Sequence, residues 1–262
     1  MTQEETILLQ AVLDEPDNDV PRLKYADWCD RQRDEPTKDR AEFIRLQIEI
    51  ARMSNAAIER GEAYNQKYDA MKLQDAHKSE WASWVGAVGN DFEFNRGFVE
   101  LVSLSARDFL ENAARLFELA PVYHLGLTNV VSVADELFAS NYLGRMRSLQ
   151  MDNCGLNDIH LQILAASPHV SELRWLSLRE NEIGMAGMEA LVKSPYLKQL
   201  KYTNFGGNPV DPCEELGIDG EVVVATWMPE AGQILENQFG YIPWLHRQGE
   251  TISDYHPSRF RV

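Results

Sequence analysis

The sequence predicts an α/β protein: a right-handed solenoid of parallel strands with helices on its convex side, preceded by a small all-helical domain. A leucine-rich stretch recurs at an offset of 27 residues. The first ninety residues show only helical spacing of apolar residues, and an alternating pattern followed by a helical one comes next. Repetition at such a period is typical of solenoids, and a change of apolar spacing marks a change of secondary structure.

The repeat is clearest in two copies, which begin at Met146 and Leu173. Both follow the order L-x-x-L-x-L-x-x-N/C-x-L, and the match extends to Leu164 with Leu191 and to Ser167-Pro168 with Ser194-Pro195. This order is typical of a leucine-rich repeat, in which a short strand with inward leucines leads through a buried amide or thiol into a helix.

Further copies flank these two. A partial copy from Leu200 places Asn208 opposite Asn181, and a shorter copy through Leu125 lies 24 residues before its counterpart. At least four strands are therefore expected to stack in parallel. We expect the side chains of Asn181 and Cys154 to bond backbone groups that would be unpaired where the chain leaves each strand.

Helices are predicted for the first ninety residues. Thr2 and Glu5 form a capping-box pattern for a helix that stops before Pro16, and a second helix is expected to open at Asp19. A polar break over residues 31–39 separates it from a third, longer helix. That third helix contains Phe43, Leu46, Ile50, Met53 and Ala57 at helical spacing.

A fourth helical segment is predicted from Glu62 to about Val85, after Gly61 ends or bends the third helix. Its expected anchoring residues are Tyr64, Tyr68, Met71, Trp81, Trp84 and Val85. The alternation of residues 98–104 then predicts a strand, in which either Leu101 or Val102 is the inward residue, and residues 107–119 predict a helix.

The end of the chain is interpreted as a cap on the solenoid. Residues 221–227 could form one more strand and residues 229–239 one more helix, with Trp227, Phe239 and Trp244 covering the last apolar edge. The predicted domains are therefore a helical domain at 1–90, leucine-rich repeats at 91–216 and a capping segment at 217–262.

Composition limits the classes of partner and compartment. The formal charge of −16 argues against binding to a phosphate backbone, and no apolar run is long enough to span a bilayer. The N-terminus lacks the features of a secretory signal, so we expect a cytoplasmic protein. Three widely spaced cysteines, Cys29, Cys154 and Cys213, suggest reduced thiols rather than a disulfide framework or a zinc site.

Two segments of the chain resemble a known bacterial module. Residues 17–28, Asp-Asn-Asp-Val-Pro-Arg-Leu-Lys-Tyr-Ala-Asp-Trp, and residues 41–47, Ala-Glu-Phe-Ile-Arg-Leu-Gln, look like the repeat-companion domain. The Arg96-Gly-Phe-Val-Glu100 segment and the Ser-Pro pieces are similar to the ribonuclease-inhibitor-type leucine-rich repeats that follow this domain. The resemblance implies a protein-binding scaffold with convex helices, and it implies no catalytic residue.

A binding face follows from the repeat alignment. Residues that alternate with the inward leucines should face the concave side of the solenoid. Trp, Tyr and Arg are the residue types that most often anchor protein interfaces. The predicted partner-binding residues are His124, Gln150, Asp152, Trp175, Ser177, Arg179, Tyr202 and Asn204.

Two alternatives to that face stay open. Trp175 and Tyr202 could simply cover apolar surface or pack beneath the N-terminal helices. The helical domain could instead dock a partner through Tyr25, Asp27 and Trp28, although a structural role is the more common one for such residues, with Asp27 capping a helix or pairing with an arginine such as Arg45.

No motif in the sequence supports catalysis. The six histidines lack metalloprotease spacing, and no nucleophile elbow, P-loop or dinucleotide motif occurs. We therefore expect a non-enzymatic protein-protein interaction module without cofactor or metal. The alternatives are a structural scaffold or spacer subunit of a larger bacterial assembly and a hydrolase or metal site built from Cys213, His246, Asp254 and His256 in the C-terminal tail. The sequence leaves the oligomeric state open.

Overall fold

The computed structural model describes residues 2–54, 57–58, 60–85, 91–210, 216–218, 221–223 and 229–245. The chain divides into two compact units, one of residues 1–102 and 112–122 and the other of residues 103–111 and 123–262. Helices and a mostly parallel sheet build these units, so the predicted mixed α/β class is confirmed. Among the helices of the described ranges, none has the length and apolar character needed to cross a membrane.

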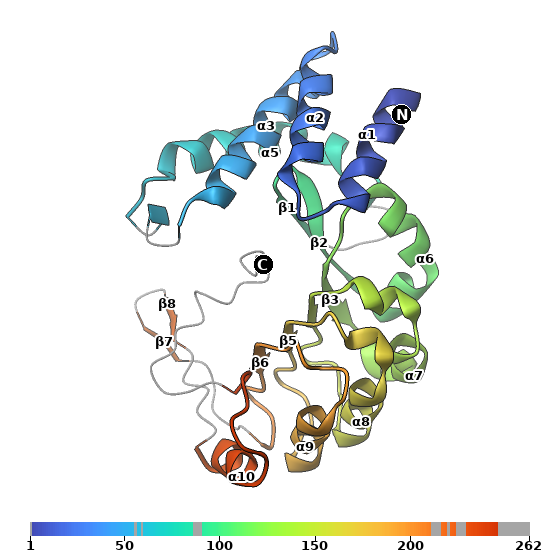
Figure 1. Cartoon of the computed structure of the whole chain (residues 1–262), viewed down its shortest axis with the longest axis vertical. Helices are drawn as coiled ribbons and strands as arrows, with labels where there is room; N and C mark the ends of the chain where they lie inside the picture. Colours follow the sequence, from blue (N-terminus) through green and yellow to red (C-terminus); the bar gives the residue numbers. More distant parts are fainter. Residues whose placement is uncertain are drawn as a thin grey trace. The chain divides into compact units, whose positions relative to one another are not determined.

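In the first unit, α1 (Gln3–Asp14), α2 (Asp19–Asp30), α3 (Glu35–Arg52) and α5 (Tyr64–Trp81) follow one another (Figure 1). The predicted capping box of Thr2 and Glu5 is present at α1. The cap of α2 is Asn18, whose side chain accepts the Val20 amide, and α3 begins at Glu35, inside the predicted polar break. The break is shorter than predicted because Asp34 accepts the Thr37 amide and so starts a helix there.

The prediction of the anchoring residues was wrong for the first half of α5. Tyr64, Tyr68 and Met71 are 71%, 45% and 51% exposed. The inward face of α5 carries Ala70, His77 and Trp81 instead, because polar side chains on that face bond to residues of α3. Gln66 donates to Glu49 at 3.1 Å, His77 Nε2 lies 2.7 Å from Asp39, and the Trp81 indole donates to the Pro36 carbonyl.

A hairpin follows the helices of the first unit. β1 (Asp91–Asn95) and the start of β2 (Phe98–Ser105) are joined by Arg96 and Gly97, with φ of 49° and 82°. Two consecutive left-handed residues define the turn that matches the twist of paired strands. Gly97 is required, because a Cβ there would lie 2.8 Å from the Cα of Ile44, and the Gln47 side chain accepts its amide at 2.7 Å.

The turn and the helices share a buried ionic cluster. Glu100 accepts hydrogen bonds from Arg22 at 2.7 Å and from Arg96 at 2.9 Å, and the side chains of all three residues are at most 7% exposed. Arg22 also donates to the carbonyls of Pro16, Asn95 and Arg96. Residues 17–28 and the Arg96–Glu100 segment therefore meet in one buried cluster.

Among the described residues, six strands hydrogen-bond in chain order, and the last four are β3 (His124–Thr128), β4 (Ser148–Gln150), β5 (Trp175–Ser177) and β6 (Tyr202–Asn204). These four are parallel. The strand predicted at 98–104 is confirmed as β2 and the helix predicted at 107–119 as α6 (Ala106–Leu119), and Val102 rather than Leu101 is the buried residue.

Helical segments return the chain between the parallel strands. They are η2 (Val130–Val133), α7 (Ala134–Phe138), η3 (Asn141–Arg145), α8 (Asp158–Ala166), η4 (Pro168–Val170) and α9 (Met185–Lys193). Figure 1 places α7, α8 and α9 next to one another on one side of β3–β6. Ser167 and Ser194, which occupy equivalent repeat positions, each donate to a carbonyl of the preceding segment, Phe138 and Ala165, at 2.6 Å.

The backbone repeats as the sequence does. Asn129, Asn153, Glu180 and Gly207 have φ of 55°, 50°, 53° and 77°, and they occupy one position in successive copies. Leu125, Leu149 and Leu176 are paired across the strands and fully buried. The inward leucines and the strand exits predicted from the alignment are therefore confirmed.

The C-terminal part differs from the prediction. β8 (Glu221–Val223) pairs antiparallel with β7 (Leu216–Ile218) in a separate two-stranded sheet, so it does not extend the parallel array. The helix predicted at 229–239 is confirmed as α10 (Pro229–Phe239). Trp244 is buried, its ring lies 6.4 Å from that of Phe205, and its carbonyl accepts the Thr203 hydroxyl at 3.2 Å. Trp227 lies outside the described residues.

Candidate functional site

The residues predicted to form the first column of the binding face lie in register. His124, Ser148, Trp175 and Tyr202 are partners across β3–β6. The rings of Trp175 and Tyr202 stack at 5.3 Å with an interplanar angle of 6°, and His124 Nδ1 lies 2.8 Å from the Ser148 hydroxyl. Little of this column is accessible, because Trp175 is 9% exposed, His124 4% and Tyr202 1%.

The second and third columns differ in exposure. Gln150, Ser177 and Asn204 are paired across β4–β6, but only Gln150 is exposed, and Ser177 and Asn204 are buried. Asp152 and Arg179, just beyond the strands, are half-buried. The accessible part of the predicted set is therefore Gln150, Asp152 and Arg179, named here the strand-exit patch.

Hydrogen bonds fix the strand-exit patch. One carboxylate oxygen of Asp152 accepts the Ser177 hydroxyl at 2.6 Å and the Arg179 amide at 2.9 Å. Its other oxygen accepts the Gln150 side-chain amide at 2.8 Å. Because one carboxylate ties together side chains of two neighbouring copies, the patch is held in a defined shape before any partner arrives.

Behind the patch, buried amides join each copy to the one before it. Asn181 Oδ1 accepts the amides of Cys154 and Leu156 at 3.0 Å, and its Nδ2 donates to three carbonyls, of which Met151 belongs to the preceding copy. Asn208 repeats this pattern one copy later toward Ile183 and Leu178. The role predicted for the amide at position 181 is confirmed.

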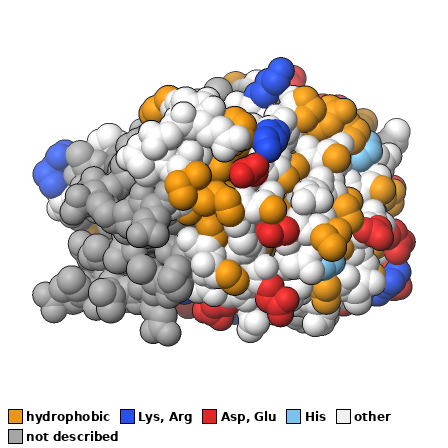
Figure 2. Space-filling view, turned by 90° about the horizontal axis from the view of Figure 1, so that it is seen from below, with side chains coloured by type: hydrophobic (Ala, Val, Ile, Leu, Met, Phe, Trp, Pro, Cys, Tyr) orange, Lys and Arg blue, Asp and Glu red, His pale blue; other side chains and the backbone are white. Residues whose placement is uncertain are grey.

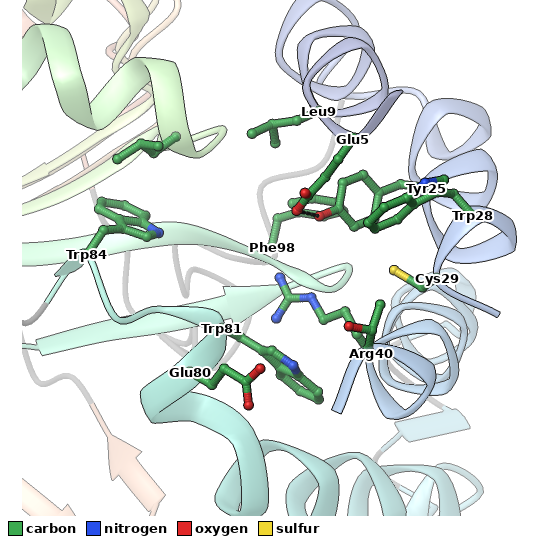
Figure 3. Close-up of a pocket in the computed structure, with 12 residues that line it drawn as sticks. Glu5, Leu9, Tyr25, Trp28, Cys29, Arg40, Glu80, Trp81, Trp84 and Phe98 are labelled. Carbon is green, nitrogen blue, oxygen red and sulfur yellow. Dashed lines mark hydrogen bonds between the residues drawn. The ribbon is translucent and has the colours of Figure 1, made fainter. Parts of the chain in front are cut away.

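The first unit contains a cavity that the sequence did not predict. Its volume is about 340 Å³, and Figure 3 shows its lining side chains reaching in from α1, α2, α3, the end of α5 and β2. Aromatic rings form much of the wall. The lining residues are Glu5, Leu9, Tyr25, Trp28, Cys29, Thr37, Arg40, Glu80, Trp81, Trp84, Phe98 and Leu119.

Arg40 is the cation of this pocket. Its guanidinium carbon lies 4.7 Å from the ring centre of Trp81, 5.1 Å from that of Phe94 and 5.5 Å from that of Phe98. Its Nη1 is enclosed and donates no hydrogen bond to any residue that the structure describes. Burial lowers the pKa of Arg40 to about 10, which leaves the side chain charged at neutral pH.

Tyr25 and Cys29 lie in the same wall in protonated form. Burial is the main cause that raises the pKa of the Cys29 thiol to about 12, and burial followed by the charge of Glu5 raises the pKa of the Tyr25 phenol above its usual range. The Tyr25 hydroxyl donates to Glu5 at 3.2 Å. No reactive thiolate is therefore available in this pocket at neutral pH.

These two groups predict a loss of stability in alkali. Both pKa values are higher in the folded state, so their contribution is complete below about pH 9 and falls as the pH rises toward 12. We expect the free energy of unfolding, measured with urea between pH 8 and 11, to fall less steeply in a Tyr25→Phe, Cys29→Ala double variant than in the unmodified chain. Equal slopes would contradict the assignment.

The structure also places the residues of the alternative sites that the sequence suggested. Asp27 pairs with Arg45 at 2.8 Å, as expected for a structural role, and Trp28 is buried. Within the described ranges, no cluster of His, Cys, Asp and Glu could hold a metal ion. Cys213, His246, Asp254 and His256, the residues of the alternative tail site, lie outside those ranges.

Comparisons of the chain with protein-family models, curated proteins and solved structures found no match.

Proposed function

We propose that this chain is a non-catalytic, cytoplasmic interaction module, in which a leucine-rich-repeat solenoid of the ribonuclease-inhibitor type follows a repeat-companion domain and recognises a protein partner through the strand-exit patch. The observation that carries the proposal is the group of Gln150, Asp152 and Arg179, which lies at and just beyond the ends of the parallel strands β4 and β5 and shares hydrogen bonds to the Asp152 carboxylate. Preformed polar groups around an arginine suit protein recognition.

Surface charge supports a protein partner rather than nucleic acid. The chain carries 41 acidic and 25 basic residues. On the described part of the face in Figure 2, lysine and arginine side chains are few and lie among acidic and apolar ones. Binding to nucleic acid requires clustered cations that displace counterions, so a partner with basic and polar groups is the better fit.

The burial of the aromatic column favours a second candidate, a scaffold or spacer. Trp175 and Tyr202 stack on each other and expose little surface, as residues with a structural role do. A Trp175→Ala variant would therefore remove packing as well as any contact with a partner. The partner test needs a substitution at an accessible residue instead.

Arg179→Glu is the substitution that tests the interaction module. We expect the tagged Arg179→Glu chain to capture at least about tenfold less of the partner that the unmodified chain captures from its native host, measured by quantitative mass spectrometry. Glutamate lacks the hydrogen-bond donors of the guanidinium and repels the acceptor group of the partner that faces position 179. Lys198→Glu is the matched control, since Lys198 is exposed on the connection after α9 and the change of charge is the same.

The two candidates predict different results. Full capture by Lys198→Glu with loss in Arg179→Glu supports recognition through the strand-exit patch. Equal capture by both variants, with circular dichroism spectra like that of the unmodified chain, would contradict it and favour the scaffold.

A further inference from the structure

The pocket of the first unit contains a charge that none of the described residues neutralises. Buried or half-buried cations in proteins normally have an anionic or hydrogen-bonding partner, because an enclosed donor without one costs free energy. Arg22 and Arg96 in the same unit follow this rule through Glu100. Arg40 does not: its Nη1 is enclosed and has no hydrogen-bond partner among the described residues.

The surroundings of Arg40 leave room for a hydrogen-bond acceptor inside the pocket. Figure 3 shows the Arg40 side chain reaching from α3 into the middle of the pocket, beside Trp81 and Phe98. The aromatic rings hold the cation in place by cation–π attraction but supply no acceptor in the plane of the guanidinium. Among the described residues none places an acceptor in that plane, and a molecule that enters the pocket would supply one.

The size and walls of the pocket restrict that molecule. A cavity of about 340 Å³ is at the small end of ligand pockets, which suits a single ring with a short side chain. Trp28, Trp81 and Trp84, with Leu9 and Leu119, offer aromatic and apolar surface for such a ring. A purely polar ligand would leave this wall unused.

The carboxylates of the lining restrict the ligand's charge. Glu5 is occupied by the Thr2 amide and the Tyr25 hydroxyl, and Glu80 is exposed at the rim. Two negative charges near one cation disfavour a dianion such as a phosphate monoester. A carboxylate carries one charge and matches the planar donors of a guanidinium.

We propose that this pocket binds a small aromatic monocarboxylate, whose carboxylate pairs with Arg40 and whose ring packs against the tryptophans. The same chemistry is present in a free aryl-alkanoic acid and in the C-terminus of a peptide that ends in an aromatic residue. The site is independent of the strand-exit patch, because all its residues belong to the first unit.

The test uses the full chain and isothermal titration calorimetry with 3-phenylpropanoate. We expect this acid to bind at least about tenfold more tightly than its neutral amide, 3-phenylpropanamide, because a charge-assisted hydrogen bond to an enclosed donor discriminates by that factor or more. The acid should also raise the melting temperature of the protein, since it binds the folded state. Equal affinities for the acid and the amide, or no binding of either, would overturn the proposal.

Arg40→Met gives the decisive comparison. Methionine keeps an unbranched apolar side chain among the rings, and no partner group is left unsatisfied by the change. We expect the preference for the acid over the amide to disappear in Arg40→Met. It should persist in Arg45→Met, the matched control on α3, because Arg45 pairs with Asp27 and Asp30 outside the pocket. Loss of the preference in both variants would contradict the assignment to Arg40.

Two further ligands test whether the natural ligand is a free acid or a peptide C-terminus, and whether the pocket prefers a cation to an anion. The peptide Gly-Gly-Phe binds as tightly as the free acid if the natural ligand is a peptide terminus and more weakly if it is a free acid, and either result supports the carboxylate site. Phenethylamine tests the opposite charge. If Arg40 moves aside and the aromatic wall with Glu80 prefers this cation over the acid, the proposal is wrong.

Discussion

Replacing Glu100 with glutamine is expected to lower the free energy of unfolding by about 3–5 kcal/mol, the range for removing one partner of a buried ion pair. The substitution keeps the shape of the side chain but removes the negative charge between Arg22 and Arg96. Two guanidinium groups would then lie buried against a neutral amide, with the 2.7 Å and 2.9 Å contacts no longer charge-balanced. Urea unfolding followed by far-ultraviolet circular dichroism measures the change.

The control for Glu100 is an ion pair of the same type on the surface. Glu4 accepts a hydrogen bond from Arg31 at 2.9 Å, and both side chains are more than half exposed. Glu4→Gln should leave the free energy of unfolding almost unchanged, because water screens exposed pairs. If Glu100→Gln is as mild as Glu4→Gln, the cluster does not hold the hairpin to the helices.

Asn181→Ala is expected to lower the free energy of unfolding by about 3 kcal/mol, because several buried backbone groups lose a partner at once and each unsatisfied group costs roughly 1–3 kcal/mol. The side chain of Asn181 is buried and makes five hydrogen bonds, to two amides and three carbonyls. Loss of the Asn181 side chain should also speed the hydrogen exchange of the backbone amides of Cys154 and Leu156, which mass spectrometry or NMR can measure.

Asn237→Ala is the matched control for this substitution. Asn237 lies exposed on α10 and accepts one hydrogen bond from Gln233. An exposed asparagine within a helix contributes little, and alanine favours the helix, so stability should stay the same or rise slightly. A loss of less than about 1 kcal/mol in Asn181→Ala would mean that water replaces the amide and that the link between copies is weak.

The repeats could be predicted in detail because the sequence contains its own comparison. Aligning residues 146–156 with residues 173–183 gives the strand register, the inward leucines and the strand-exit amide without any knowledge of long-range contacts. The left-handed residues were not predicted, although Asn129, Asn153 and Gly207 are types that adopt this conformation readily. Glu180 is not such a type and gave no signal.

The pocket could not be predicted, because its walls come from elements far apart in the sequence. Arg40 stands in the polar run Lys38-Asp39-Arg40, which reads as a solvated helix face. Only the packing of α5 and β2 against α3 surrounds it with rings. The same kind of contact decides which face of α5 is buried, since Tyr64 and Tyr68 have helical spacing but the bonds of Gln66 and His77 turn the helix the other way.

The solvent exposure of the predicted binding face could not be predicted from the sequence either. Alternation along a strand distinguishes its two sides but does not say how much solvent reaches either side. Ser177 and Asn204 lie on the predicted side of the sheet strands and are nevertheless buried, whereas Gln150 in the same column is exposed.

The direction of the asparagine bonds gives the repeat array a polarity. Asn181 serves the amides of Cys154 and Leu156, and Asn208 serves the amide of Ile183, so each copy completes the hydrogen bonds of its predecessor. Inserting another block of 27 residues between copies would preserve every such bond. Truncation before Asn208 would leave the Ile183 amide without its acceptor and destabilise the preceding copy. Internal duplication of a copy therefore keeps the hydrogen bonds of the array complete, whereas loss of the last copy destabilises the copy before it.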